Sequence, residues 1–251
     1  MDGEIVTTLS RRTLIRTGLA APLALSACRG AAEPREEQCK RELLPNLDFP
    51  QLGKYRADDA RLIASNAPVD VVFMGDSITE GWKDKRPAFF SPGRIGRGIG
   101  GQTTPQMVLR MMADVVRLKP KAVHIMAGTN DIAGNTGPMT PEMTQDNFRM
   151  MSDIARAHRI KVLVASIPPA AAFPWRPGLE TRKPIADVNA WLKRFALSTG
   201  ATWIDYHQVL DDGTGAMKPG LAYDGVHPTE AGYDAMATVL NPILRKLLGR
   251  A

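Results

Sequence analysis

Apolar runs typical of buried strands alternate along the chain with stretches whose apolar residues recur at helical spacing. Five runs predict strands, and glycine interrupts the second of them: 69–74, 94–99, 122–127, 161–167 and 201–205. Helical patterns lie between the later strands and at the C-terminal end, near 104–118, 141–158, 185–199 and 228–248. Because strands that alternate with helices form a parallel sheet covered on both faces, we expect a three-layer α/β/α sandwich with a flavodoxin-like five-stranded parallel sheet.

Residues 1–27 have the pattern of an export signal. Two adjacent arginines stand in the segment 10–16, as in twin-arginine signals, and a modestly apolar run follows at 17–27. That run is shorter than the roughly 20 residues that cross a bilayer. The basic N-terminus of a cytoplasmic enzyme is the alternative, but Leu25-Ser26-Ala27-Cys28 resembles the bacterial lipobox, which implies a two-chain lipid anchor on Cys28.

The segment 28–48 is rich in charge, alanine and proline, and its charges alternate in sign, which predicts a tether. The remaining residues, 49–251, are enough for one catalytic domain with a substantial core. Cys39 is left unpaired if Cys28 is acylated, and the two could form a disulfide in an oxidising compartment if it is not. Two cysteines by themselves cannot make a structural zinc site, so neither a metal nor a redox role is expected.

Lysine and arginine number 32 against 26 aspartates and glutamates, a formal charge of +6, but the cations are scattered along the sequence. Nucleic-acid-binding proteins concentrate cations on one face and often place aromatic residues among them. The sequence has no such block. Nucleic acid is therefore not expected as a partner, and most charges are expected on a solvated surface.

The glycine run Gly96–Thr103 matches two nucleotide-binding motifs. It fits Gly-x-Gly-x-x-Gly, and it fits the phosphate loop except that Gln102 replaces the lysine that reaches the phosphates. The run follows the second strand rather than the first, and no acidic residue ends the next strand, so nucleotide binding is disfavoured. Backbone N–H groups of such a loop, at the start of a helix, are equally suited to an oxyanion.

Polar residues with catalytic potential follow several predicted strands. Ser77 ends Gly75-Asp76-Ser77 after the first strand, Asn130 follows the third, and Asp224 and His227 stand near the C-terminus. Because open α/β sheets bind ligands at the carboxyl ends of their strands, these side chains are candidates for one site. Each also has a simpler interpretation as a turn residue or a helix cap. Asp224 and His227 could be two metal ligands, but no third ligand is evident.

His227 is the best candidate base among the four histidines. His124 lies inside an apolar strand and is expected in the core, and His158 ends a helix, where a cation suits the dipole. His207 follows the fifth strand but lacks an adjacent carboxylate.

Four ordered blocks together resemble the SGNH hydrolases, also called GDSL-like esterases and lipases: Gly75-Asp76-Ser77, Gly98–Thr104, Gly128–Asp131 and Asp224–Pro228. The resemblance extends from about Asp70 to the last helix. The glycine block is especially similar to that of the platelet-activating-factor acetylhydrolase catalytic subunits and their bacterial relatives. Many of these relatives carry an acidic residue where this chain has Gln102. This difference affects the expected details of the oxyanion loop and not the triad.

The resemblance implies a role for each matching residue. Ser77 would be the nucleophile, His227 the general base, and Asp224 the residue that orients the imidazole. The oxyanion hole would consist of the backbone N–H groups of Ser77 and Gly101 and the side-chain amide of Asn130. No cofactor and no metal are implied.

Four residues are candidates for substrate contact. The segment 168–178 follows the fourth strand and holds four prolines, so it is stiff, and it would bring Phe173, Trp175 or Arg176 to the cleft. A surface loop that packs its own aromatic residues is the alternative. The fourth candidate is Asp76, beside Ser77.

The sequence therefore predicts a serine esterase for short-chain acyl esters, above all acetyl esters, on carbohydrates or other extracytoplasmic small molecules. It would be a cell-envelope lipoprotein on the periplasmic side of a bacterial membrane, anchored at Cys28 after twin-arginine export. A lysophospholipase or thioesterase acting on lipids is one alternative. A non-catalytic glycan-binding lipoprotein and a nucleotide-binding protein are the others.

Overall fold

The computed structural model describes residues 48–90 and 92–249. Contacts within the chain separate the first 49 residues from the rest, and the fold is that of Pro50 onwards. The segments interpreted as signal and tether lie outside the described residues apart from Asp48, and so do Cys28 and Cys39.

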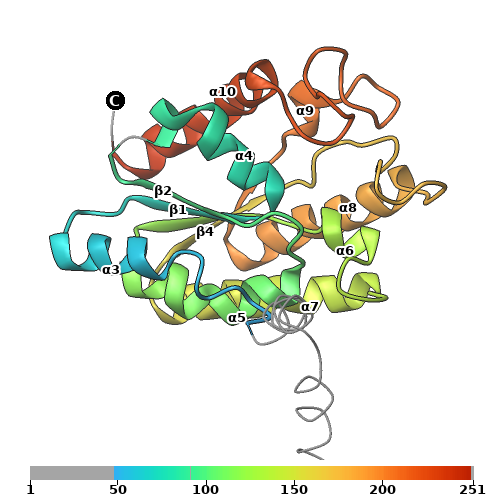
Figure 1. Ribbon diagram of the computed structural model, residues 1–251. Coiled ribbons are helices and arrows are strands. Elements are labelled where there is room, and N and C mark those ends of the chain that lie inside the picture. The colour runs from blue at the N-terminus through green and yellow to red at the C-terminus, as the bar shows by residue number, and fades with distance from the viewer. Residues whose placement is uncertain (1–47, 91, 250–251) are drawn as a thin grey trace, which may run out of the picture. The chain divides into compact units, whose positions relative to one another are not determined.

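Five parallel strands form one sheet in the order β2-β1-β3-β4-β5 (Figure 1). Each strand begins at or within two residues of the predicted start: β1 (Val71–Gly75), β2 (Arg94–Gly98), β3 (Ala122–Met126), β4 (Lys161–Ala165) and β5 (Thr202–Ile204). Strand β1 pairs on both sides, with Val71 opposite Arg94 in β2 and opposite Ala122 in β3. The order reverses once, between β1 and β3, and this flavodoxin-like topology confirms the prediction.

Helices cover both faces of the sheet, which confirms the three-layer architecture. In Figure 1, α4 (Ser77–Lys85) and α10 (Glu230–Leu247) lie above the sheet. Below it lie α3 (Arg56–Ser65), α5 (Thr104–Asp114), α7 (Pro141–Ala157) and α8 (Arg182–Thr199). Shorter elements occur in the connections: α6 (Thr129–Ala133), α9 (His207–Leu210), and 3-10 turns at Pro87–Phe90 and Val116–Leu118.

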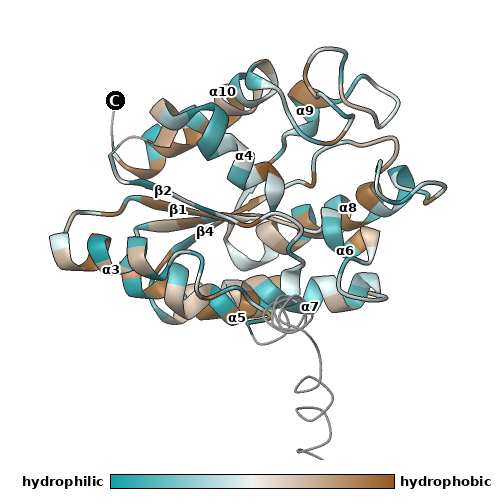
Figure 2. Cartoon of the chain, in the orientation of Figure 1, coloured by the Kyte–Doolittle hydropathy of each residue, from teal (hydrophilic) through white to brown (hydrophobic). Residues whose placement is uncertain are grey.

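The core lies on both sides of the central strands, which are the most apolar part of the chain (Figure 2). Every residue of β1 and β3 is buried, as expected for strands covered by helices on both faces. Above the sheet, Phe73 packs edge-to-face against Trp82, which stacks on Tyr233 of α10 at 5.6 Å between ring centroids. This packing fixes α4, and with it the residue that begins α4, against the sheet.

The hydrophobic pattern gave no indication of helix α3. Its buried side chain is a carboxylate, Asp59, which accepts hydrogen bonds from the fully buried guanidinium of Arg97 at 2.6 and 2.9 Å. A helix that docks through an ion pair has no apolar periodicity to reveal it. Within the described ranges, no helix combines the length and the apolar character needed to cross a bilayer.

Candidate active site

Ser77 and His227 lie within hydrogen-bonding distance although 150 positions separate them in the sequence. Ser77 is the first residue of α4, directly after β1, and His227 lies on the loop that leads into α10. The distance from Ser77 Oγ to His227 Nε2 is 2.9 Å, and that from His227 Nδ1 to Asp224 Oδ2 is 2.7 Å. The structure thus brings together the three residues to which the resemblance assigned a triad.

The loop around Asp224 holds this carboxylate in a fixed orientation. Its Oδ1 accepts hydrogen bonds from the backbone N–H groups of Val226 and His227, at 2.9 and 2.7 Å, and Gly225 allows the tight turn with φ of +85°. Partial burial raises the pKa of Asp224, but the hydrogen bonds from His227 and Val226 outweigh it and leave the pKa below its ordinary value. An ionised Asp224 favours a proton on Nδ1, which leaves the Nε2 lone pair directed at Ser77.

Asp76 has a structural role in the turn before Ser77. Its side chain accepts from the N–H of Ile78 at 2.9 Å and so caps α4. Only 2% of the residue is exposed, and this burial raises the pKa of its carboxyl group to about 6. Its carboxylate is therefore engaged by the helix N-terminus, and contact of Asp76 with substrate stays a prediction.

The glycine loop after β2 packs tightly against α4. A Cβ on Gly98 would lie 2.1 Å from the backbone nitrogen of Glu80, so only glycine allows this approach. The N–H of Gly100 donates to the Glu80 carboxylate at 2.6 Å, and a Cβ on Gly100 would lie 3.8 Å from that of Ser77. Gly101 follows with φ of +75° at the exposed tip of the loop. The loop therefore runs beside Ser77.

The side chain of Asn130 spans two loops at this edge of the sheet. Its Nδ2 donates to the carbonyl of Gln102 at 3.0 Å, and its Oδ1 accepts from Asn135 at 2.8 Å. These contacts fix the direction of the amide and leave one Nδ2 hydrogen without a partner among the described residues.

Sequence reasoning missed Arg110, a fully buried residue of α5. Its Nε donates to the side-chain oxygen of Gln102 at 2.7 Å, and its Nη2 donates to the carbonyl of Gly75 at 2.9 Å. A third contact, at 2.9 Å, pairs it with Asp114. The only available signal was an arginine among the apolar positions of an amphipathic helix, a pattern that usually places arginine at the surface.

Two exposed aromatic side chains flank the imidazole of His227. Tyr223 stacks on it at 5.6 Å between ring centroids, and Trp175 lies 6.1 Å away. Trp175 is 38% exposed and Tyr223 is 62% exposed. Phe173 is only 1% exposed and stacks on Trp175 at 5.1 Å, so it supports Trp175, and its own contact with substrate stays a prediction. Sequence reasoning did not single out Tyr223.

Trp175 and Arg176 sit beside the loop of α6. The indole Nε1 of Trp175 donates to the side chain of Asn135 at 3.2 Å, which connects Trp175 through Asn135 to Asn130. Arg176 is exposed, and its Nη2 would lie 3.8 Å from a Cβ placed on Gly134. Both side chains are therefore available to a substrate, whereas those of Asp76 and Phe173 are buried.

The other histidines have structural roles. His124 is a core residue, as expected: its Nε2 lies 2.9 Å from the Tyr206 hydroxyl, and burial lowers its pKa to about 3. His158 is the C-cap of α7, also as expected. His207 Nε2 lies 2.8 Å from the carbonyl of Ile167. Among the described residues, no group of three or more histidine, cysteine, aspartate or glutamate side chains is arranged to hold a metal ion.

Comparison with known proteins shows the family to which the chain belongs. The model of the GDSL-like Lipase/Acylhydrolase family matches residues 73–235. A GDSL-like lipase from Bacteroides thetaiotaomicron is 40% identical, with a TM-score of 0.75 over 79% of this chain and 98% of that one. A candidate acylhydrolase from Bacteroides fragilis is 41% identical, with a TM-score of 0.75 over 80% and 98% of the two chains.

A shorter match is to the uncharacterized lipoprotein YqeF of Bacillus subtilis, 40% identical over 79 residues. It covers 30% of this chain and 32% of that relative's length. The family match spans more than half of the chain and includes Ser77 and Asp224, and the structural matches cover nearly all of both Bacteroides proteins. The chain therefore belongs to the GDSL-like lipase/acylhydrolase family.

Proposed function

We propose that this chain is a serine esterase that hydrolyses short acyl esters, above all acetyl esters, through an acyl-enzyme formed on Ser77. The observation that carries the proposal is the 2.9 Å distance between Ser77 Oγ and His227 Nε2, with Asp224 on the other ring nitrogen. Membership of a family of lipases and acylhydrolases supports the same class of reaction.

The reaction proceeds in two acyl transfers. His227 Nε2 takes the proton of Ser77 as the serine oxygen bonds to the ester carbonyl carbon, and Asp224 stabilises the imidazolium. The tetrahedral intermediate then expels the alcohol, which receives the proton from His227. A water molecule, deprotonated by His227, attacks the acyl-enzyme in the same way, and the carboxylic acid leaves as Ser77 regains its proton.

Three donors are available for the oxyanion that develops on the carbonyl oxygen. The N–H of Ser77 begins a helix, where no intrahelical acceptor exists and negative charge is favoured. The N–H of Gly101 is at the tip of the adjacent loop, and the uncommitted Nδ2 hydrogen of Asn130 belongs to an amide that Asn135 holds in place. Donors fixed before the reaction need no reorganisation in the transition state.

A carbohydrate alcohol suits the surroundings of the triad. Trp175 and Tyr223 present exposed aromatic surface next to His227, and such surface packs well against the C–H face of a sugar ring. Because both rings are partly solvated, the alcohol half of the ester would rest against an exposed surface that admits a polar molecule.

We further propose that the protein is an envelope lipoprotein acylated at Cys28. The support is the lipobox-like sequence together with the partial match to a protein named a lipoprotein. Metabolic labelling with a radioactive or alkyne-bearing fatty acid tests it. Wild-type protein should incorporate the label and Cys28→Ala should not, whereas equal labelling of both would contradict the anchor.

Labelling with a fluorophosphonate tests the esterase, since this probe reacts with activated serines. The wild type and a Ser198→Ala control, altered at an exposed serine of α8, should be labelled, and Ser77→Ala should not. The wild type and Ser198→Ala should also hydrolyse p-nitrophenyl acetate, and Ser77→Ala should not. Near-normal turnover by Ser77→Ala would disprove the nucleophile. An unlabelled wild type that binds glycans would favour a non-catalytic protein, and a strong preference for lysophospholipid over acetylated sugars would favour a lipid hydrolase.

A further inference from the structure

Exposed cations gather at the amino edge of the sheet, opposite the edge that carries Ser77 and His227. This edge, at the left in Figure 1, is where strands begin and the long helices α7 and α10 end. Eight exposed lysines and arginines lie in its turns and last helical turns: Arg117, Lys119, Lys121, Arg156, Arg159, Lys161, Arg245 and Lys246. We call these eight residues the basic edge. The parallel topology thus brings together cations that are far apart in the sequence.

The basic edge is almost free of compensating charge. Lys121 pairs with Asp70 at 2.8 Å, and in the described part of the chain the other seven cations have no ion pair and no side-chain hydrogen bond. Some exposed cations elsewhere have acidic partners close in sequence, for example Lys183 with Asp187 at 2.5 Å and Arg149 with Asp146 at 2.6 Å. The described segments 115–121, 155–161 and 244–249 contain no aspartate or glutamate.

Helix dipoles account for only part of this charge. A cation in the last turn of a helix is stabilised by the dipole, which applies to Arg156 in α7 and to Arg245 in α10. Four of the cations lie beyond the helix ends: Lys119, Lys121 and Arg159 lie in the turns that enter β3 and β4, and Lys161 begins β4. Like charges at close range repel, so a surface of this kind is better explained by an external anion than by the stability of the fold.

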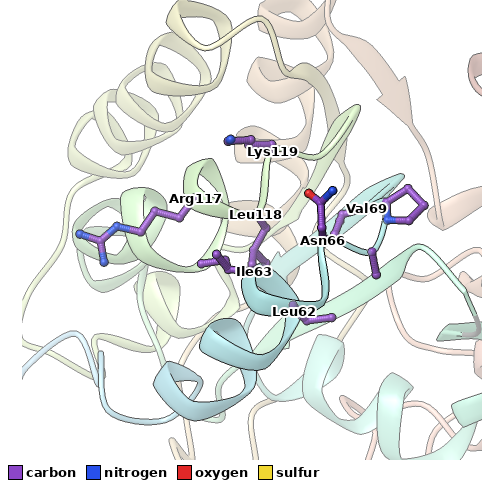
Figure 3. Close-up of a pocket in the computed structure, with 9 residues that line it drawn as sticks. Leu62, Ile63, Asn66, Val69, Arg117, Leu118 and Lys119 are labelled. Carbon is purple, nitrogen blue, oxygen red and sulfur yellow. The ribbon is translucent and has the colours of Figure 1, made fainter.

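Two pockets open on the basic edge, and cations line each of them. One, of about 200 Å³, has an apolar floor that includes Leu62 and Leu118, and Figure 3 shows Arg117 and Lys119 extending outward from it. Ile63, at its rim, is 49% exposed. The other, of about 250 Å³, is lined by Arg156, Lys161 and the start of β5. The backbone N–H of Lys161 donates a hydrogen bond to the carbonyl of Lys121 at 3.0 Å, and this hydrogen bond connects the turns that lie between the two pockets.

We propose that the basic edge docks on an anionic phospholipid bilayer, with phosphate headgroups entering the two pockets. Cations contacting several headgroups at once, together with an exposed apolar side chain such as Ile63, fit a charged interface better than a single soluble anion. The sheet then stands between the bilayer and the active site. Strands of five residues at about 3.3 Å per residue place Ser77 roughly 17 Å further out, facing away from the lipid.

Vesicle sedimentation tests the docking surface on the full chain carrying Cys28→Ser, so that acylation does not contribute. In this background, Arg117→Gln, Lys119→Gln and Lys161→Gln are combined as the edge variant. Arg56→Gln, Lys183→Gln and Lys218→Gln, which remove the same charge elsewhere, form the control. All three proteins share one N-terminal segment, so its contribution cancels.

We expect the parent and the control to bind vesicles rich in phosphatidylglycerol, and the edge variant to bind at least tenfold more weakly, since each cation at an anionic surface contributes about fivefold. Binding should fall in 1 M salt and with phosphatidylcholine vesicles. Turnover of p-nitrophenyl acetate should be equal in all three proteins. An equal loss in the control would mean that binding follows net charge and would overturn the proposal. Equally tight, edge-dependent binding of heparin would also overturn it, by indicating a general polyanion surface.

Discussion

Arg110 holds Gln102 through a 2.7 Å hydrogen bond from its Nε to the side-chain oxygen. The same guanidinium donates to the carbonyl of Gly75, two residues before Ser77. One buried side chain thus connects the loop that presents Gly101 to the strand that presents Ser77. The amide nitrogen of Gln102 donates in turn to the carbonyl of Pro50 at 2.9 Å, which a carboxylate at this position could not do.

Arg110→Lys should lower kcat about 10- to 100-fold with little change in KM. Lysine keeps the charge but cannot satisfy the Gln102 and Gly75 oxygens together, and small displacements of catalytic groups are costly. Arg97→Lys is the matched control, since Arg97 is equally buried but pairs with Asp59. Kinetics and chemical denaturation of both variants are the measurements. If both variants lost the same stability and the same fraction of kcat, Arg110 would have only a structural role.

Asn130→Ala should lower kcat about 10²–10³-fold, because it removes a donor to the proposed oxyanion. Asn147→Ala is the control: it removes a buried amide that donates to Thr104 Oγ1 at 2.9 Å, away from Ser77. That variant should lose stability and keep its kcat. Steady-state kinetics decide the matter, and a change in KM alone for Asn130→Ala would indicate ordinary substrate binding.

Trp175→Ala should raise KM for acetylated sugars by up to about tenfold, since aromatic contacts contribute about 1 kcal/mol. Its effect on p-nitrophenyl acetate should be smaller. Trp191→Ala provides a matched control, because Trp191 also stacks on a phenylalanine, Phe195 at 4.9 Å, but lies on α8. Unchanged selectivity between sugar and phenyl esters in Trp175→Ala would mean that the loop only packs its own aromatic residues.

Asp76 predicts a dependence of stability on pH. Burial raises its pKa in the folded protein to about 6, so the folded state holds this proton more tightly than the unfolded chain. The contribution of Asp76 to stability is therefore greatest below about pH 4 and declines as pH rises to 6, by up to about 3 kcal/mol. Asparagine still caps the helix but does not ionise.

Denaturation of the wild type and Asp76→Asn at several pH values tests this relation. The stability of Asp76→Asn relative to the wild type should increase between pH 4 and pH 6 and then level off. A difference that stays constant over this interval would refute the raised pKa.

The sequence was sufficient for the sheet but not for every layer around it. Strands β1, β3 and β4 are apolar runs bounded by turn residues, whereas glycines interrupt the run of β2 and made it the weaker prediction. Helix α3 was missed because an ion pair docks it. The convergence of Ser77 and His227 followed from strand ends and the family resemblance, whereas Arg110 and Tyr223 depend on partners distant in sequence that no local pattern reveals.

The hydrogen bond from Gln102 to the carbonyl of Pro50 couples the start of the domain to the glycine loop. Chain upstream of Pro50 enters the fold at the residue that holds the side chain next to Gly101. Tension on that upstream chain would therefore reach the glycine loop before any strand of the sheet. Truncation or fusion of the protein immediately before Pro50 puts the new junction next to the residue that supports that loop, so we expect the choice of junction to affect the measured rate.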